Sequence, residues 1–203
     1  NVALREGERD QARRHYAEAI ELAGPDSVEG LTAGLNIARS EEADHTLVTL
    51  RDLQPRVQAL RRPDQRARLA LNLGEQARGL GEEAGELALA ALEAARVAAA
   101  QAGDSRLEVE AMDALAQLHE ERRGTVEAFR LTRTALDRAG WELQDLRFSL
   151  DWRLARLHEA AGESDEALAA YERAVHALEA IRIDIPIQYD DGRSSYRATF
   201  QPL

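Results

Sequence analysis

Two histidine–glutamate pairs are the side chains of this sequence that come nearest to a metal-binding motif. They lie in the stretches HEERR (119–123) and HEAAG (158–162), which begin like the zinc-binding motif H-E-x-x-H. Neither stretch carries the second histidine that would place two ligands on one helix face. The sequence therefore predicts no zinc protease site. We expect His119 and His158 to lie between helices, each with one ring nitrogen bonded to a neighbour.

The other candidate motifs each lack a residue that their chemistry needs. GEEAG (81–85) has no lysine and two acids that would repel a phosphate, and GRSSY (192–196) does not match the G-x-S-x-G turn of a serine nucleophile. Because the chain has no cysteine and all 26 of its Lys+Arg positions are arginine, a thiolate, a P-loop lysine and a Schiff base are excluded. Asp190 and Asp191 are expected to form a turn with Gly192. We find no catalytic constellation and expect no metal or cofactor.

The charge of the chain argues against two classes of partner. The formal net charge is −11, which opposes binding to nucleic acid and to anionic membranes. No apolar run approaches the roughly 18 residues of a membrane span, and the N-terminus lacks the apolar core of a signal peptide. We therefore expect a cytoplasmic protein. Charge is also uneven, because residues 51–78 hold seven arginines and residues 79–121 hold ten acidic residues.

Helical periodicity runs through almost the whole chain and places these side chains on helices. Hydrophobic residues make up 44% of the sequence and aromatic residues only 4%, which favours helices packed through small side chains. Pro55 should kink or split the third helix, and Pro186 should end the last helix near residue 182. With glycines and N-cap residues as boundaries, the predicted helices span 2–23, 26–39, 42–61, 64–79, 83–101, 104–122, 125–139, 143–161 and 164–181.

A repeat of about 36 to 42 residues underlies this pattern. The segments LAQLHE (115–120) and LARLHE (154–159) are each followed by a glycine, the pair Glu-Ala and a second apolar helix. Two earlier stretches, LNIARSE (35–41) and LNLGEQA (71–77), fit the same slot less closely. A small residue beside a large one lets a partner helix approach closely. The small positions that this alignment makes equivalent are Ala38, Gly74, Ala116 and Ala155.

The repeat resembles the tetratricopeptide repeat (TPR), although its units are somewhat longer. The residues that carry the second-helix pattern are Gly7, Ala12, Tyr16, Ala19 and Pro25 at the start, Ala128, Thr132 and Ala135 in the middle, and Gly162, Ala167, Tyr171 and Ala174 at the end. The resemblance implies an all-α fold, an α-α superhelix (TPR-like solenoid) of about nine helices. It would cover residues 1–182 as a half repeat at 1–25 followed by four helical hairpins.

Apolar residues occupy every second position of the C-terminal stretch, namely Ile181, Ile183, Ile185, Ile187 and Tyr189. The segment LEAIRIDIPIQYDDGRSSYRATFQPL (178–203) resembles the junction between a TPR array and a CHAT domain, a caspase-like peptidase fold, in bacterial proteins. This resemblance implies that residues 183–203 form an extended connector whose isoleucines pack against the last helix pair. The peptidase histidine–cysteine pair has no counterpart here, since the chain contains no cysteine.

A TPR fold implies that partners bind the exposed positions of the first helix in each repeat. Counted from the large–small pair, the predicted groove residues are Arg68, Glu75 and Arg78 in one repeat, Glu110, Asp113, Gln117 and Glu120 in the next, and Ser149, Trp152, Arg156 and Glu159 in the last. An arginine-bearing stretch beside an acidic one suits an extended peptide of mixed charge or a segment of the same protein. Trp152 is the predicted anchor.

The function expected from this sequence is a protein-interaction and regulatory scaffold that is not itself an enzyme. The CHAT resemblance implies control of an adjacent peptidase domain outside this chain. One alternative is the TPR sensor region of a bacterial transcription activator, which would carry a helix-turn-helix domain elsewhere. A second alternative is a helical-bundle enzyme that binds a metal or cofactor. The sequence leaves the oligomeric state open.

Overall fold

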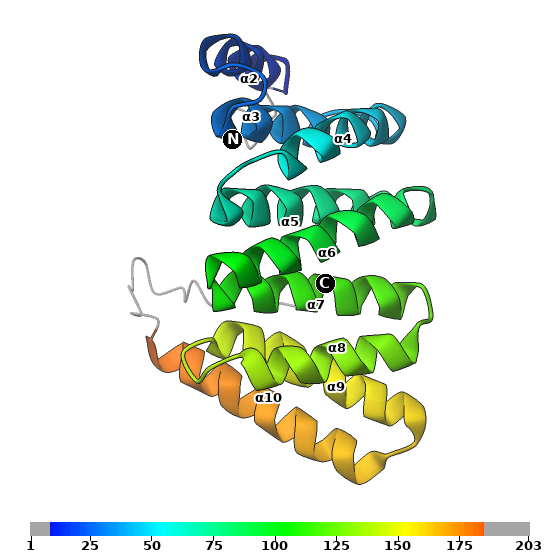
Figure 1. Cartoon of the computed structure of the whole chain (residues 1–203). Helices are drawn as coiled ribbons and strands as arrows, with labels where there is room; N and C mark the ends of the chain where they lie inside the picture. Colours follow the sequence, from blue (N-terminus) through cyan, green and yellow to red (C-terminus); the bar gives the residue numbers. More distant parts are fainter. Residues whose placement is uncertain (1–8, 185–203) are drawn as a thin grey trace, which may run out of the picture. The chain divides into compact units, whose positions relative to one another are not determined.

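The computed structural model describes residues 9–184, which form nine α-helices, one short 3-10 turn and no strand (Figure 1). The predicted all-α fold class is confirmed. The helices are α2 (Arg9–Ala23), α3 (Val28–Arg39), α4 (Ala43–Gln58), α5 (Pro63–Gly79), α6 (Gly85–Ala102), α7 (Ser105–Glu121), α8 (Thr125–Arg138), α9 (Gln144–Ala161) and α10 (Ser164–Asp184), with the 3-10 turn η1 at Glu82–Ala84.

The predicted end of the last helix differs from the structure. Helix α10 continues to Asp184, so residues 183 and 184 are helical and do not belong to an extended connector. The rest of the predicted connector, with the turn at Asp190 and Asp191, lies outside the described residues. So do residues 2–8 of the first predicted helix.

The helices fall into two compact units, divided between Gly140 and Trp141. The first unit contains α2 to α8, and the second contains α9 and α10. Each unit is built from helix pairs that follow one another in the sequence. The continuous solenoid over residues 1–182 remains a prediction.

Helical hairpins are the building element of both units. In the first unit, α3 packs on α4, α5 on α6 and α7 on α8, while α2 packs on α3 as the predicted half repeat (Figure 1). Helix α5 also contacts α3 and α7, so the first helices of successive hairpins are neighbours. In the second unit, α9 and α10 form a hairpin. This is the packing that the repeat alignment predicts.

Small residues at the repeat position allow these helices to approach closely. Ala38, Ala116 and Ala155 are completely buried. A Cβ atom added to Gly74 would lie 2.6 Å from Cδ2 of Leu92 on α6 and 3.2 Å from its backbone nitrogen. The four small positions that the repeat alignment makes equivalent are therefore all buried. Helix α6 continues this packing with small side chains, since its buried alanines are Ala88, Ala91, Ala95, Ala98 and Ala99.

Local signals set most helix ends. The side chain of Ser27 accepts a hydrogen bond from the backbone N–H of Gly30 at 2.9 Å, and that of Asp104 accepts one from Leu107 at 3.0 Å. These two N-caps satisfy amide groups that the first helical turn leaves unpaired.

Helix α7 ends at Glu121, one residue before its predicted end. The left-handed residue that follows it is Arg123, with φ 61°. At the corresponding end of α9 this position is occupied by Gly162, with φ 79°.

Pro55 does not divide the third predicted helix. Helix α4 runs from Ala43 to Gln58 with Pro55 inside its last turn, so the expectation of a split at this residue is wrong. A proline removes one backbone donor from a helix interior. Here only three residues follow Pro55 before the helix ends, so the interruption leaves little helix beyond it to detach.

Candidate partner-binding surfaces

The first candidate surface lies on α5 and α7, which two ion pairs hold side by side. Nη2 of Arg68, near the start of α5, lies 3.6 Å from Oδ2 of Asp104, the N-cap residue of α7. Nη1 of Arg78, near the end of α5, lies 2.6 Å from Oε1 of Glu121, the last residue of α7. The start of one helix therefore lies beside the start of the other, and the two helices run parallel.

The residues predicted on these helices differ in exposure. Arg68 and Glu75 are exposed, whereas the side chain of Arg78 is only 21% exposed. The four on α7 are half-buried, and their spacing of three or four residues places them on one helix face. Among these is Glu110, which accepts a hydrogen bond from Nε of Arg106 at 3.0 Å. The half-buried set is Glu110, Asp113, Gln117 and Glu120.

The structure does not pair the α5 arginines with this acidic row. Arg68 and Arg78 pair instead with Asp104 and Glu121, which lie at the two ends of α7 and were not among the predicted residues. These pairings depend on how the first helices of two successive hairpins align, which helical periodicity alone does not give. The acidic row forms a half-buried polar strip on α7.

A polar cluster that the sequence did not indicate joins α3 to α5. The amide nitrogen of Gln76 donates to the carbonyl oxygen of Leu35 at 3.1 Å and to Oδ1 of Asn72 at 2.7 Å. Arg39 Nη2 donates to the same oxygen of Asn72 at 3.4 Å. Glu75 and Gln76 line a shallow cleft of about 300 Å³ beside this cluster.

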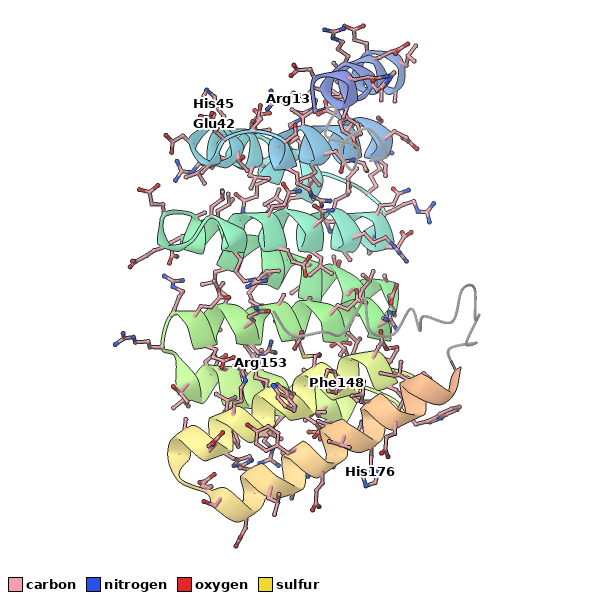
Figure 2. All side chains as sticks on the ribbon, turned by 180° about the vertical axis from the view of Figure 1, so that it is seen from behind. Arg13, Glu42, His45, Phe148, Arg153 and His176 are labelled. Atoms are coloured by element: carbon pink, nitrogen blue, oxygen red, sulfur yellow. The ribbon has the colours of Figure 1, made fainter. Side chains whose placement is uncertain are left out.

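The second candidate surface is an aromatic cluster on α9 and α10. The ring of Trp152 meets that of Tyr171 edge-on at a centroid distance of 5.0 Å, and it lies 6.1 Å from that of Phe148. Figure 2 labels Phe148 on α9. Trp152 is 45% exposed, so about half of this side chain is available for contact. Trp152 was predicted as a binding residue, whereas Phe148 was not. Tyr171 was predicted only as part of the TPR pattern of the second helix.

Charged groups border this cluster. The hydroxyl of Tyr171 donates to Oε2 of Glu159 at 3.0 Å. Desolvation raises the pKa of Tyr171 above its usual value, and the hydrogen bond to Glu159 raises it further. Arg156 is exposed on the same helix as Glu159, whereas the hydroxyl of Ser149 donates to the backbone of its own helix, at Leu146.

A buried ion pair supports α9 and α10. The side chain of Asp151 is 2% exposed, and its Oδ1 lies 2.8 Å from Nε of Arg173 on α10. A buried carboxylate needs such a partner, because desolvation without one is costly. This pair fixes the two helices that carry Trp152 and Tyr171.

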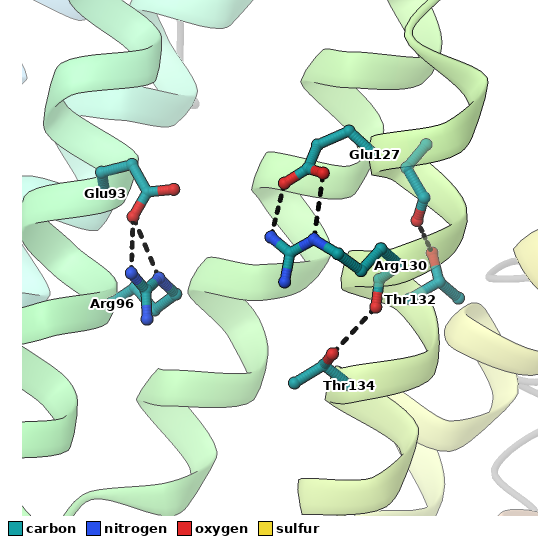
Figure 3. A network of polar contacts seen from close by, with 7 residues as sticks. Glu93, Arg96, Glu127, Arg130, Thr132 and Thr134 are labelled. Carbon is teal, nitrogen blue, oxygen red and sulfur yellow. Dashed lines mark hydrogen bonds and ion pairs between the residues drawn. The ribbon is translucent and has the colours of Figure 1, made fainter.

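Helices α6 and α8 each carry an ion pair between residues of the same helix. Glu93 pairs with Arg96 at 2.8 Å, and Glu127 pairs with Arg130 at 2.5 Å (Figure 3). The guanidinium of Arg130 lowers the pKa of Glu127. Thr132, in the slot where the TPR pattern has an aromatic residue, donates to the carbonyl of Ala128 at 2.8 Å. Glu93, Arg96, Glu127 and Arg130 are therefore engaged within their own helices.

Residues 9–184 contain no group of three or more histidine, aspartate or glutamate side chains that is arranged to hold a metal ion. No helix there is both long and apolar enough to cross a bilayer. As expected for one of the two histidines, Nδ1 of His158 lies 2.6 Å from Oε2 of Glu163.

Comparison with solved structures places the fold. The crystal structure titled "Crystal structure of MamA" matches with a TM-score of 0.64 and 17% identity over 90% of this chain and 95% of that chain. A second, titled "Crystal structure of MamA protein", matches with a TM-score of 0.62 and 16% identity over 93% of each chain. The chain has a TPR-like fold. No protein-family model matches the sequence, and no curated protein is similar to it.

Within the TPR-like fold, the candidate surfaces lie on the first helices of the repeats. Helices α5 and α7 carry one surface, and α9 carries most of the other. At 17% identity, the similarity to MamA concerns the arrangement of helices. The role of these surfaces must be argued from their own side chains.

Proposed function

We propose that this chain is a protein-interaction module that acts as a regulatory scaffold and catalyses no reaction itself. The observation that carries the proposal is the half-exposed Trp152, held against Tyr171 and bordered by Glu159. A rigid aromatic side chain with polar neighbours is typical of residues that dominate binding energy. Because its ring is already packed, Trp152 loses little conformational freedom on binding.

The partner that best suits these surfaces is an extended protein segment with apolar and charged side chains. Exposed Arg68 and Glu75 offer opposite charges along α5, and Arg156 and Glu159 do so along α9. Opposite charges fix the register of a bound segment more than they add affinity. The segment belongs either to another protein or to a different part of the same protein.

The regulatory part of the proposal rests on the sequence resemblance of the C-terminal stretch. A cytoplasmic CHAT peptidase domain adjacent to this chain would respond when a partner occupies the repeats, and the isoleucine-rich stretch would transmit the change. Polar substitution of Ile183, Ile185 and Ile187 in a full-length protein should then abolish activation of the peptidase by its partner. Unchanged activation would refute this link. The alternative, a sensor region of a transcription activator, requires a helix-turn-helix domain in the neighbouring coding sequence.

The interaction function can be tested by comparing two exposed tryptophans. Peptides selected from a random library on the wild-type chain should bind the variant Trp152→Ala at least about 30-fold more weakly, equivalent to about 2 kcal/mol. Trp141→Ala is the matched control, because Trp141 is 83% exposed and lies outside the aromatic cluster. Equal losses in the two variants, or a library that yields no binder, would refute the proposed surface.

A further inference from the structure

A cleft with three arginines lies at the turns of two neighbouring hairpins. It has a volume of about 690 Å³ and is lined by the end of α5, the loop that leads to α6, and the end of α7. The arginines are Arg78, Arg122 and Arg123, and Glu82 and Glu121 are the acidic residues of the lining. Residues 79, 81 and 85 in its wall are glycines, which leave the backbone open to a ligand. We call this site the arginine cleft.

One side of the Arg78 guanidinium pairs with Glu121, and the other side is buried without a hydrogen-bond partner among the described residues. Its Nη1 lies 2.6 Å from Oε1 of Glu121, whereas its buried Nε has no hydrogen-bond partner within the described part of the chain. Buried donors are nearly always paired, so a missing acceptor calls for an explanation. The Nε edge of arginine, with its neighbouring Nη, can donate two parallel hydrogen bonds to a carboxylate or phosphate.

Arg122 is already positioned in the cleft wall. Its Nη2 lies 2.8 Å from Oε1 of Glu86, a carboxylate that is 83% exposed. A Cβ atom added to Gly85 would lie 3.6 Å from Cζ of Arg122, so the guanidinium packs against the start of α6. This packing orders the charged group before any ligand arrives.

Arg123 occupies a backbone conformation that favours glycine. Its φ is 61°, and the hairpin of α9 has Gly162 at the same point, where φ is 79°. Both turns close with the same bond, from Gly124 N–H to His119 O at 2.7 Å and from Glu163 N–H to His158 O at 3.0 Å. An arginine in this conformation costs free energy that glycine would not. No ion pair of Arg123 occurs among the described residues, so internal pairing does not account for its presence.

We propose that the arginine cleft binds an oxyanion, the carboxylate or phosphate group of an acidic segment in the partner protein. The proposal rests on the interaction function and identifies the chemistry of one contact. Arg123 has no ion pair in the part of the chain that the structure describes, and there Arg78 supplies a donor that lacks an acceptor. The carboxylate of Glu121 lies beside the same guanidinium and would repel a bound oxyanion, so Glu121→Gln should bind more tightly.

The test uses small anionic probes and glycine amides as local reporters. The ¹⁵N-labelled chain is titrated at about 0.15 M salt, where long-range repulsion from the net negative charge is screened beyond roughly 8 Å. The probes are a capped tetraglutamate peptide, a capped peptide with one phosphoserine, and a capped tetralysine peptide. Saturable shifts of the amides of Gly79, Gly81 and Gly85 are expected with at least one of the two anionic peptides. Which of them binds more tightly identifies the source of the oxyanion.

Arg123→Gly gives the decisive comparison, because binding and stability should change in opposite directions. We expect this variant to bind the anionic probe at least about tenfold more weakly. Its urea midpoint should rise, because glycine relieves the strained backbone. Arg61→Gly is the matched control, since it removes the same charge from another exposed turn and should change affinity less than twofold.

Three results would overturn the proposal. They are the absence of saturable shifts with both anionic peptides, equal shifts with tetralysine, and equal weakening by Arg123→Gly and Arg61→Gly. None of these results would affect the binding of selected peptides at Trp152. Failure of the arginine cleft can therefore be distinguished from failure of the interaction function.

Discussion

Replacement of Gly74 by alanine tests the close contact of α5 with α6. In an ordinary helix this change is stabilising by about 0.5–1 kcal/mol, because alanine has less backbone freedom to lose. At Gly74 the new Cβ would lie 2.6 and 2.7 Å from two side-chain carbons of Leu92, and 3.2 Å from its backbone nitrogen. Leu92 is fully buried and has no space to move into. Overpacking of this kind costs about 1–3 kcal/mol, so we expect a net loss of about 1–2 kcal/mol.

Gly79→Ala is the matched control, since it makes the same change in the same helix. A Cβ atom at Gly79 has no neighbour within 4 Å, so this variant should be neutral or more stable by up to about 1 kcal/mol. Urea unfolding followed by circular dichroism measures both variants. If Gly74→Ala were as stable as Gly79→Ala, the two helices would not approach as described and the repeat register would be wrong.

Three further predictions concern α9, α10 and the outer surface. Ala155→Leu should overpack a fully buried position and cost about 1–3 kcal/mol, whereas Arg138→Ala on the surface should cost less than about 0.5 kcal/mol in the same urea assay. Arg173→Ala should destabilise the chain by about 1–3 kcal/mol, because it leaves a buried carboxylate unpaired although the arginine itself is half-exposed. The raised pKa of Tyr171 favours its neutral form, so its contribution to stability holds below the usual tyrosine pKa and disappears as pH rises through the folded value. Glu159→Gln should lower that pKa, and an ultraviolet titration against Tyr171→Phe would measure the shift.

Helix positions were predictable because their signals are local. Gly103 and Gly162 take the left-handed conformation at helix ends, and Ser27 and Asp104 cap the helices that follow. The buried small positions could be identified for a similar reason, since each stands beside a larger apolar residue in the sequence. Helix α7 ends at Glu121, one residue before its predicted end, and Arg123 adopts the left-handed conformation although a glycine follows it.

The candidate site was predictable only in part. Trp152 was identified from its repeat position, but its contact with Tyr171 joins two helices and depends on their packing. The ion pair of Arg78 with Glu121 likewise joins residues 43 positions apart. The arginine cleft combines a loop, two helix ends and one strained residue, and no period in the sequence connects these elements.

The alanine-lined contact of α6 has a consequence for the order in which the chain folds. Alanine has no side-chain torsion to immobilise, so the α5–α6 hairpin freezes fewer rotamers on closing than an interface built from leucine or methionine alone. Its segments are also adjacent in sequence, which keeps the entropy of loop closure small. We expect this hairpin to act as the nucleus, with its amides slowest to exchange in deuterated water and those of α2, which packs on α3, fastest. Equal protection of α2 and α6 would mean that the first unit assembles all at once.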